Sequence, residues 1–82
     1  MKHHKRLQKI IASPANVRFG EMVTLVQAFG FRLLRTSGAH HLFGRAGINE
    51  QLNLQNVKGK AKPYQIRQFL KIVERYNLTM DE

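Results

Sequence analysis

Two adjacent histidines are the side chains of this sequence best suited to proton transfer. His40 and His41 lie in the central part of the chain, and imidazole titrates near neutral pH, so each can accept or donate a proton. They fall in a predicted strand, where neighbouring side chains point to opposite faces of a sheet. The two rings then cannot form the acid–base pair of one site. We expect one histidine to be functional and the other to be structural or to face a partner.

A run of alternating lysines is the second chemical feature. Lys58, Lys60 and Lys62 lie in the segment 56–62, immediately before Pro63. Proline is favoured in the first turn of a helix, and a helix N-terminus offers unpaired N–H groups and a partial positive charge. Lysines beside it add mobile positive charge, for which phosphate is the natural ligand. The alternative is a solvated loop that charge keeps soluble, and we predict phosphate binding.

The other side chains argue against several chemistries. Glu21, Glu50 and Glu74 fall on three separate predicted elements, whereas a glycosidase needs two carboxylates across one cleft. His3 and His4 are near the N-terminus, the central histidines diverge and the chain has no cysteine, so three or four zinc ligands do not come together. No glycine motif that cradles the phosphates of a nucleotide is present. We therefore expect no metal and no other cofactor.

The balance of charge indicates the class of partner. The chain has 82 residues, with 14 Lys and Arg against 5 Asp and Glu, which gives a formal net charge of +9. On one small domain this excess favours a polyanionic partner, with nucleic acid first, an acidic protein second and an anionic membrane surface third. Charge can also serve solubility alone. No apolar run approaches the roughly 20 residues that span a bilayer, and a chain without cysteine suits a reducing cytoplasm, where we expect the protein.

Helical periodicity occurs at both ends of the chain. Residues 1–12 predict a short basic helix that the proline-containing segment 13–16 ends, and residues 19–29 predict a second helix that Gly30 caps. A third helix should begin at Pro63. The apolar side chains expected to be buried are Leu7, Ile10 and Ile11 in the first helix, Phe19, Met22, Val23, Val26 and Phe29 in the second, and Ile66, Phe69, Leu70, Val73 and Tyr76 in the third.

Three short strands are predicted between the second and third helices. They cover residues 31–36, 40–45 and 51–55, and we expect the lysine segment after them to be a loop. Odd and even positions of the first strand should face opposite ways, and Leu52 and Leu54 of the third should share a face. Short connections make neighbouring strands antiparallel. The prediction is an α+β domain in the order α-α-β-β-β-α, with a three-stranded antiparallel sheet and the helices on one of its faces.

Cleavage of RNA is compatible with so small a set of reactive residues. The substrate brings its own nucleophile, because the 2′-hydroxyl attacks the adjacent phosphorus once a base takes its proton. A nearby cation then stabilises the charge on the phosphate oxygens. One histidine with a lysine or arginine close by is sufficient for a slow enzyme.

Around the histidines the chain resembles the HicA family of bacterial toxins. Gly30-Phe31 follows the second predicted helix, and Gly38-Ala39-His40-His41-Leu42-Phe43 leads into the second predicted strand. The family pattern is a helix ending in Gly-Phe, a strand, then Gly-Ser-His-His and an apolar residue, followed by a third strand and a final helix. The likeness covers residues 19–78, which leaves residues 1–18 as a basic N-terminal helical extension.

The resemblance implies a fold like the double-stranded-RNA-binding domain and a ribonuclease that cuts messenger RNA without a metal ion. Such a toxin is silenced by a HicB-like antitoxin protein within a toxin–antitoxin system. By family position His40 is the catalytic residue, and Gly38 belongs to its turn. We expect Gly38 to contact RNA together with Lys58, Lys60 and Lys62, the lysines that charge and the helix start already indicate. Ala39 departs from the family pattern, because it lacks the usual serine hydroxyl that could orient the turn or contact phosphate.

Two other functions remain open from the sequence. A non-catalytic RNA-binding module of the same fold would also use the lysine segment, and Ala39 favours it slightly. An interaction protein could instead dock its basic face on an acidic protein. Cleavage of RNA in EDTA separates an enzyme from a binding module, and the salt dependence of RNA binding separates both from the third function.

Overall fold

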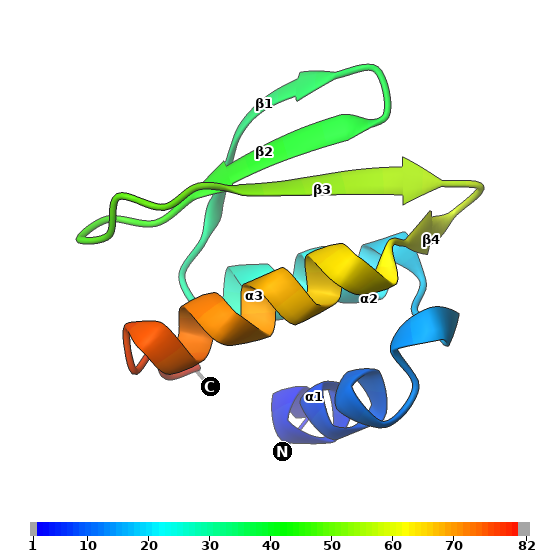
Figure 1. The fold of residues 1–82 in the computed structure, drawn as a ribbon, viewed down its shortest axis with the longest axis horizontal. Coiled ribbons are helices and arrows are strands. Elements are labelled where there is room, and N and C mark those ends of the chain that lie inside the picture. The colour runs from blue at the N-terminus through cyan, green and yellow to red at the C-terminus, as the bar shows by residue number, and fades with distance from the viewer. Residues whose placement is uncertain (1, 81–82) are drawn as a thin grey trace.

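An antiparallel sheet covered on one face by helices forms the framework of the protein. The computed structural model describes residues 2–80. In Figure 1 the sheet forms one layer, α2 and α3 lie against one of its faces, and α1 packs beyond them, farthest from the sheet. The elements in chain order are α1 (Lys2–Ala12), a 3-10 turn η1 (Pro14–Asn16), α2 (Phe19–Ala28), β1 (Arg32–Ser37), β2 (His40–Gly44), β3 (Leu52–Val57), β4 (Lys60–Ala61) and α3 (Pro63–Arg75).

This arrangement is the predicted α+β class with the helices on one side, but the sheet has four strands in the order β1-β2-β3-β4. The segment expected to be a loop is a tight hairpin, in which Val57 pairs with Lys60. Lys58 and Gly59 have φ angles of 52° and 84°. Positive φ at both central residues is the pattern of a type I′ turn, whose twist matches that of the strands it joins. The prediction of a loop was wrong because this turn carries Lys-Gly instead of the more familiar Asn-Gly.

The chain between α1 and α2 runs along the outer edge of β4. The backbone N–H of Ala61 donates to the carbonyl oxygen of Val17 at 3.0 Å, and that of Phe19 donates to the carbonyl oxygen of Gly59 at 2.8 Å. Arg18 forms an isolated bridge with Lys60. The short fourth strand therefore has partners on both sides, and the lysine hairpin is held in place.

A bulge interrupts β1, so the predicted strict alternation of its side chains is wrong. Leu33 pairs with Phe43 of β2, but the next pair is Arg35 with Leu42, which leaves Leu34 as the extra residue. One inserted residue bends a strand and re-aims the side chains that follow it. All of β1 is exposed.

One hydrophobic core joins the helices to the sheet. Its fully buried members come from every main helix, from the two central strands and, in the case of Phe31, from the segment directly before β1. They are Ile10, Met22, Leu25, Val26, Phe31, Phe43, Leu52, Leu54, Ile66, Phe69 and Ile72. Residues 1–18, predicted as an extension, contribute Ile10 and Val17 to this core. The division of the chain at residue 18 stays a prediction, but within the described residues its two parts share one core.

Two residues of the predicted apolar stripes are exposed, and five others are partly buried against the core, namely Leu7, Phe19, Val23, Leu70 and Val73. Ile11 is 54% exposed and Tyr76 is 37% exposed, whereas Ile72, which was not predicted, is 1% exposed. Spacings of three and four residues both fit a helical face, so the sequence alone did not choose between Ile72 and its neighbours. Tyr76 is the C-cap of α3, where the chain leaves the helix and the buried face ends.

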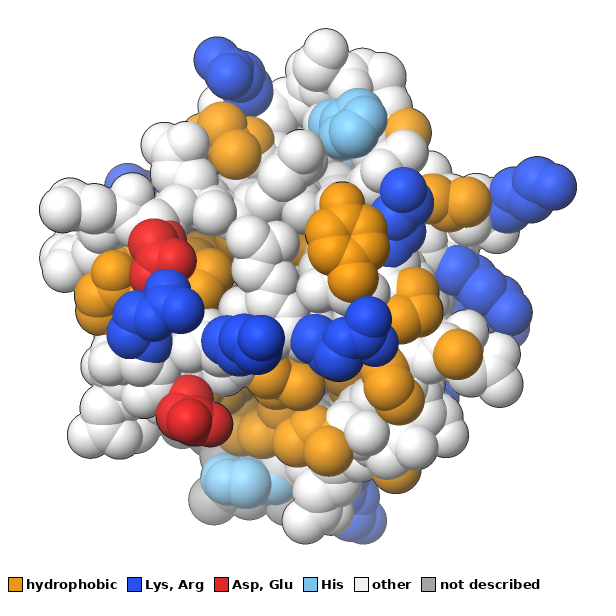
Figure 2. Space-filling view, in the orientation of Figure 1, with side chains coloured by type: hydrophobic (Ala, Val, Ile, Leu, Met, Phe, Trp, Pro, Cys, Tyr) orange, Lys and Arg blue, Asp and Glu red, His pale blue; other side chains and the backbone are white. Residues whose placement is uncertain are grey.

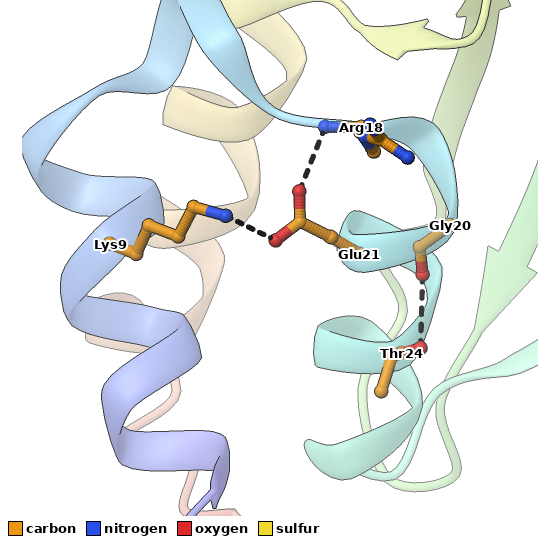
Figure 3. Close-up of polar contacts among 5 residues, drawn as sticks. All are labelled: Lys9, Arg18, Gly20, Glu21 and Thr24. Carbon is orange, nitrogen blue, oxygen red and sulfur yellow. Dashed lines mark hydrogen bonds and ion pairs between the residues drawn. The ribbon is translucent and has the colours of Figure 1, made fainter.

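An ion pair fastens α1 to α2 (Figure 3). Lys9 Nζ donates to Glu21 Oε2 at 3.0 Å, and Glu21 Oε1 accepts from the backbone N–H of Arg18 at 3.3 Å, at the start of α2. The Lys9 hydrogen bond is the main cause that lowers the pKa of Glu21 from its usual 4.5, partial burial opposes it, and the Arg18 N–H adds to it. The contribution to stability is therefore complete above that usual value and is lost as the pH falls through the lowered pKa. An exposed pair of this kind contributes about 0.2–1 kcal/mol.

No helix within residues 2–80 combines the length and the apolar character that crossing a membrane requires.

The burial of Ile10 predicts that α1 is a structural part of the domain. Ile10→Ala should lower the free energy of unfolding by about 2–5 kcal/mol, because it leaves a cavity where the side chain was fully enclosed. Ile11→Ala makes the same change one residue later on an exposed side chain, and its effect should stay within about 0.5 kcal/mol. Urea unfolding followed by circular dichroism measures both. Equal, small effects would mean that α1 is only loosely attached.

Candidate functional site

A tight turn places His40 at one end of the sheet. Ser37, the last residue of β1, pairs with His40, the first residue of β2, and only Gly38 and Ala39 lie between them. Gly38 has a φ of 59°, whereas the φ of Ala39 is not positive. A positive φ at the first central residue alone is the pattern of a type II′ turn, which favours glycine there. The local need for Gly38 is therefore conformational.

The prediction that the two histidines face opposite ways is confirmed, and His41 faces the helices. It pairs with Leu54, which is fully buried, and its ring centroid lies 4.7 Å from that of Phe19 in α2. His41 Nδ1 lies 3.1 Å from the carbonyl oxygen of Ala39. A carbonyl oxygen only accepts, so Nδ1 carries the proton and donates. His41 thus packs against Phe19 of α2 with the two rings tilted by 51°, and it holds the peptide directly before His40.

His40 lies on the face of the sheet that no helix covers. Directly opposite it across the strands are Ser37 and Gln55, while Arg35 and Asn53 are opposite Leu42, two residues further along β2. A shallow hollow of about 140 Å³ opens there, lined by Arg35, Ser37, His40, Leu42 and Asn53. The imidazole is exposed to solvent and is within reach of a ligand that lies on the open face.

Asn53 holds one nitrogen of the His40 ring. Its Nδ2 lies 3.3 Å from His40 Nδ1 and donates to it, so the proton of the neutral ring then lies on Nε2. The same amide turned over would present Oδ1 and accept from a protonated Nδ1, which would leave Nε2 as a free proton acceptor. Asn53 can therefore orient either tautomer of His40.

Arg35 provides a positive charge beside His40. Among the residues that the structure describes, no carboxylate lines the hollow, and no ion pair engages Arg35. Its guanidinium is exposed and free to bind an anion in a two-pronged manner. The sequence reasoning did not single out Arg35, Ser37 or Asn53. A two-residue turn between paired strands was the available signal, because it fixes which residues lie opposite His40.

The three predicted lysines do not line the hollow. Lys60 Nζ donates to Asn16 Oδ1 at 3.2 Å, and Lys62 Nζ lies 5.7 Å from the centre of the Tyr64 ring. They are nevertheless at the same end of the sheet as His40, because the backbone N–H of Asn56, next to the lysine hairpin, donates to the carbonyl oxygen of Ala39 at 3.0 Å. The lysines therefore flank the candidate site and do not form it.

The N-terminus of α3 is anchored beside this hairpin as predicted. Pro63 begins the helix, and Lys62 is its N-cap without a side-chain cap. Gln65, which is buried, accepts a hydrogen bond from the backbone N–H of Gln55 through Oε1 at 2.8 Å. This bond fixes the start of α3 to the part of β3 that β4 is too short to cover.

Basic side chains also gather outside the sheet. Figure 2 shows a row of lysine and arginine side chains across the face where α3 lies, with acidic side chains beside one end. Glu50 is engaged, because Arg75 forms an ion pair with it. Hydrogen bonds from Arg75 and then from Tyr76 lower the pKa of Glu50. This acid is thus offset on a surface that is otherwise strongly positive.

No group of three or more His, Cys, Asp or Glu side chains within residues 2–80 is arranged to hold a metal ion. The chain has no match among families of proteins, among curated proteins or among solved structures.

Proposed function

We propose that this protein is a ribonuclease that uses His40 and needs no metal ion, and that it acts as the toxin of a HicA-like toxin–antitoxin system. The observation that carries the proposal is the hollow on the open face of the sheet, where His40 lies beside an unpaired arginine and an orienting amide. The net charge of +9 favours a polyanionic substrate over a neutral one.

Each group around His40 has a role in this chemistry. With the Asn53 amide turned so that its Oδ1 accepts from Nδ1, Nε2 of His40 accepts the proton of the 2′-hydroxyl. The 2′-oxygen forms a bond to phosphorus, and the bond from phosphorus to the 5′-oxygen breaks. The leaving 5′-oxygen takes a proton from the imidazolium or from water, which leaves a cyclic phosphate and a 5′-hydroxyl. Arg35 stabilises the charge on the phosphate oxygens, and Asn53 orients the ring. The lysine hairpin binds phosphates at a distance from the bond that is cut.

The wider assignment rests on the motif around the histidines. We assign the domain to a fold like the double-stranded-RNA-binding domain, which also packs helices on one face of an antiparallel sheet. The proposed substrate is messenger RNA, the proposed partner is a HicB-like antitoxin, and the proposed location is the cytoplasm. The confirmed separation of His40 from His41 supports a mechanism with one histidine.

A non-catalytic RNA-binding module is the second candidate, and Ala39 is the residue that favours it. Its methyl group cannot replace a hydroxyl that orients the turn or contacts phosphate. Two features offset the loss in this chain, because His41 holds the carbonyl of Ala39 and Ser37 brings a hydroxyl to the hollow of His40. We therefore favour the enzyme.

The two histidines form a matched pair of variants that tests the mechanism. His40→Ala should keep the fold and RNA binding but lower the cleavage rate at least 100-fold, as the loss of an acid–base group does. His41→Ala should retain the chemistry but lower stability by about 1–3 kcal/mol, because it removes one hydrogen bond and one aromatic contact. Wild-type rates from a folded His40→Ala protein would end the proposal.

The lysine hairpin should supply affinity without sequence preference. Lys60→Ala combined with Lys62→Ala should weaken binding to unrelated RNAs alike and leave the circular dichroism spectrum unchanged. Each phosphate contact that is lost should flatten the slope of log K against log salt by about 0.7 for single strands. Lys5→Ala, an exposed lysine on α1, is the control for loss of charge alone. An unchanged slope in the double variant would remove the hairpin from the binding surface.

RNA and the antitoxin should compete for the same surface. A strongly basic toxin is most simply silenced when its basic face is covered, and complementary charge also speeds association. Adding a HicB-like protein to the His40→Ala variant should release bound RNA in a filter-binding assay. A stable ternary complex with RNA still held at the lysine hairpin would contradict this prediction.

A further inference from the structure

A second hollow lies on the same open face, at the far end of β2 from His40. It has a volume of about 360 Å³, and Arg32, Leu34, Gly44 and Arg45 contribute to its lining. Gly44 is four residues after His40 in one strand, so the two residues share a face. At about 3.3 Å per residue, roughly 13 Å separates them. Leu42, which lines the hollow of His40, lies between the two hollows.

A glycine and a bulge shape one wall of the second hollow. A Cβ atom on Gly44 would lie 2.8 Å from Leu34 Cδ1, closer than two carbon atoms can pack. Gly44 has no positive φ, so its backbone does not require glycine, and the absent side chain instead makes room for Leu34. The bulge in β1 places Leu34 over Gly44, with half of the Leu34 side chain exposed. Leu34 is therefore an apolar wall of the hollow beside it.

Two arginines, Arg32 and Arg45, are among the residues that line this hollow. Arg45 is held in place, because its Nε donates to the carbonyl oxygen of Phe29 at 2.8 Å. Arg32, directly opposite Gly44, has no ion-pair partner in the described part of the chain. The one carboxylate in the lining belongs to Glu50, and Arg75 engages it. An apolar wall with a cationic rim suits a flat base that carries a phosphate on each side.

We propose that the second hollow binds an unpaired base of single-stranded RNA, a few nucleotides from the phosphate at His40. The inference rests on the proposed function and names its substrate class. A stacked strand advances about 3.4 Å per nucleotide and an extended strand advances further, so 13 Å corresponds to about two to four nucleotides. Only an unpaired strand can turn a base into such a recess, because the bases of a duplex are stacked and paired. A duplex is therefore a poor substrate.

Oligonucleotides that lack one base test this inference. A set of single-stranded RNAs with the same defined cleavage site is made. Each RNA lacks one base, at one of the four nucleotides on either side of the cleaved bond. For the wild-type protein in EDTA, one position should matter most and should lower the cleavage rate about 5- to 100-fold, the range that stacking of one base supports. The same RNA in a duplex should be cut more slowly than the intact single strand.

Variants of Gly44 assign that position to the second hollow. Gly44→Val places a branched side chain where Leu34 now lies and so pushes the end of Leu34 into the hollow. The strand itself tolerates a branched residue, so this variant should cut the intact RNA as slowly as the wild type cuts the RNA without that base. Gly44→Ala should have a smaller effect of the same kind, and it serves if the valine variant does not fold. Gly20→Ala adds the same methyl group where nothing lies within 4 Å and should leave the base dependence unchanged.

The outcomes separate this inference from the proposed function. Binding of the same oligonucleotides is measured in the His40→Ala background, so that no RNA is cut. If the wild-type protein cleaves no RNA but binding still depends on the one base and on Gly44, the proposed function fails and the base site stands. If cleavage is intact but folded Gly44→Val behaves as wild type with every oligonucleotide, the base site is overturned. If Gly44→Val leaves RNA cleavage unchanged but abolishes binding of the antitoxin, the base site is also overturned, in favour of a protein-docking surface.

Discussion

The carbonyl oxygen of Ala39 is the point on which the functional end of the molecule depends. It accepts one hydrogen bond from the backbone N–H of Asn56 and a second from His41 Nδ1. The first joins the turn before His40 to the end of β3, and the second, through the contact of the His41 ring with Phe19, joins it to α2. Two hydrogen bonds from different elements restrict the rotation of this peptide. The backbone that carries His40 is therefore held although its side chain is exposed, which is what a solvent-facing reactive group requires.

Electrostatics at this end of the sheet follow from where the few carboxylates lie. Glu21 is engaged by Lys9 on the helices, and Glu50 is engaged by Arg75 at the opposite end of the sheet from the two hairpin turns. No acid of the described chain therefore offsets Arg35 beside His40. A free guanidinium with no acid nearby keeps its full attraction for an anion, and the lysine hairpin adds to the same field. The excess positive charge is therefore large and also lies at the end of the sheet that carries His40.

The sequence predicts the features that depend on local period and fails where cross-strand geometry decides. The opposite orientations of His40 and His41 follow from the period of two along a strand, and the start of α3 follows from Pro63. The bulge at Leu34 changes the register by one residue, and no residue type in that segment demands it. Arg35 and Asn53 were missed for a related reason, since they reach His40 only through pairing with two neighbouring strands. Burial of Ile72 instead of Tyr76 depends on where α3 ends and on the face that meets the sheet, which helical spacing leaves open.

The open face of the sheet is available for function because every helix within residues 2–80 lies on the other side of the sheet. A bare sheet with an exposed edge strand invites association with other strands, yet β1 carries Arg32 and Arg35 and is interrupted by a bulge, and charges and bulges are the features that discourage edge pairing. The same arginines then face any anion that lies on the open face. Protection of the edge and attraction of an anionic ligand therefore place the same demand on β1, so one pair of residues can satisfy both.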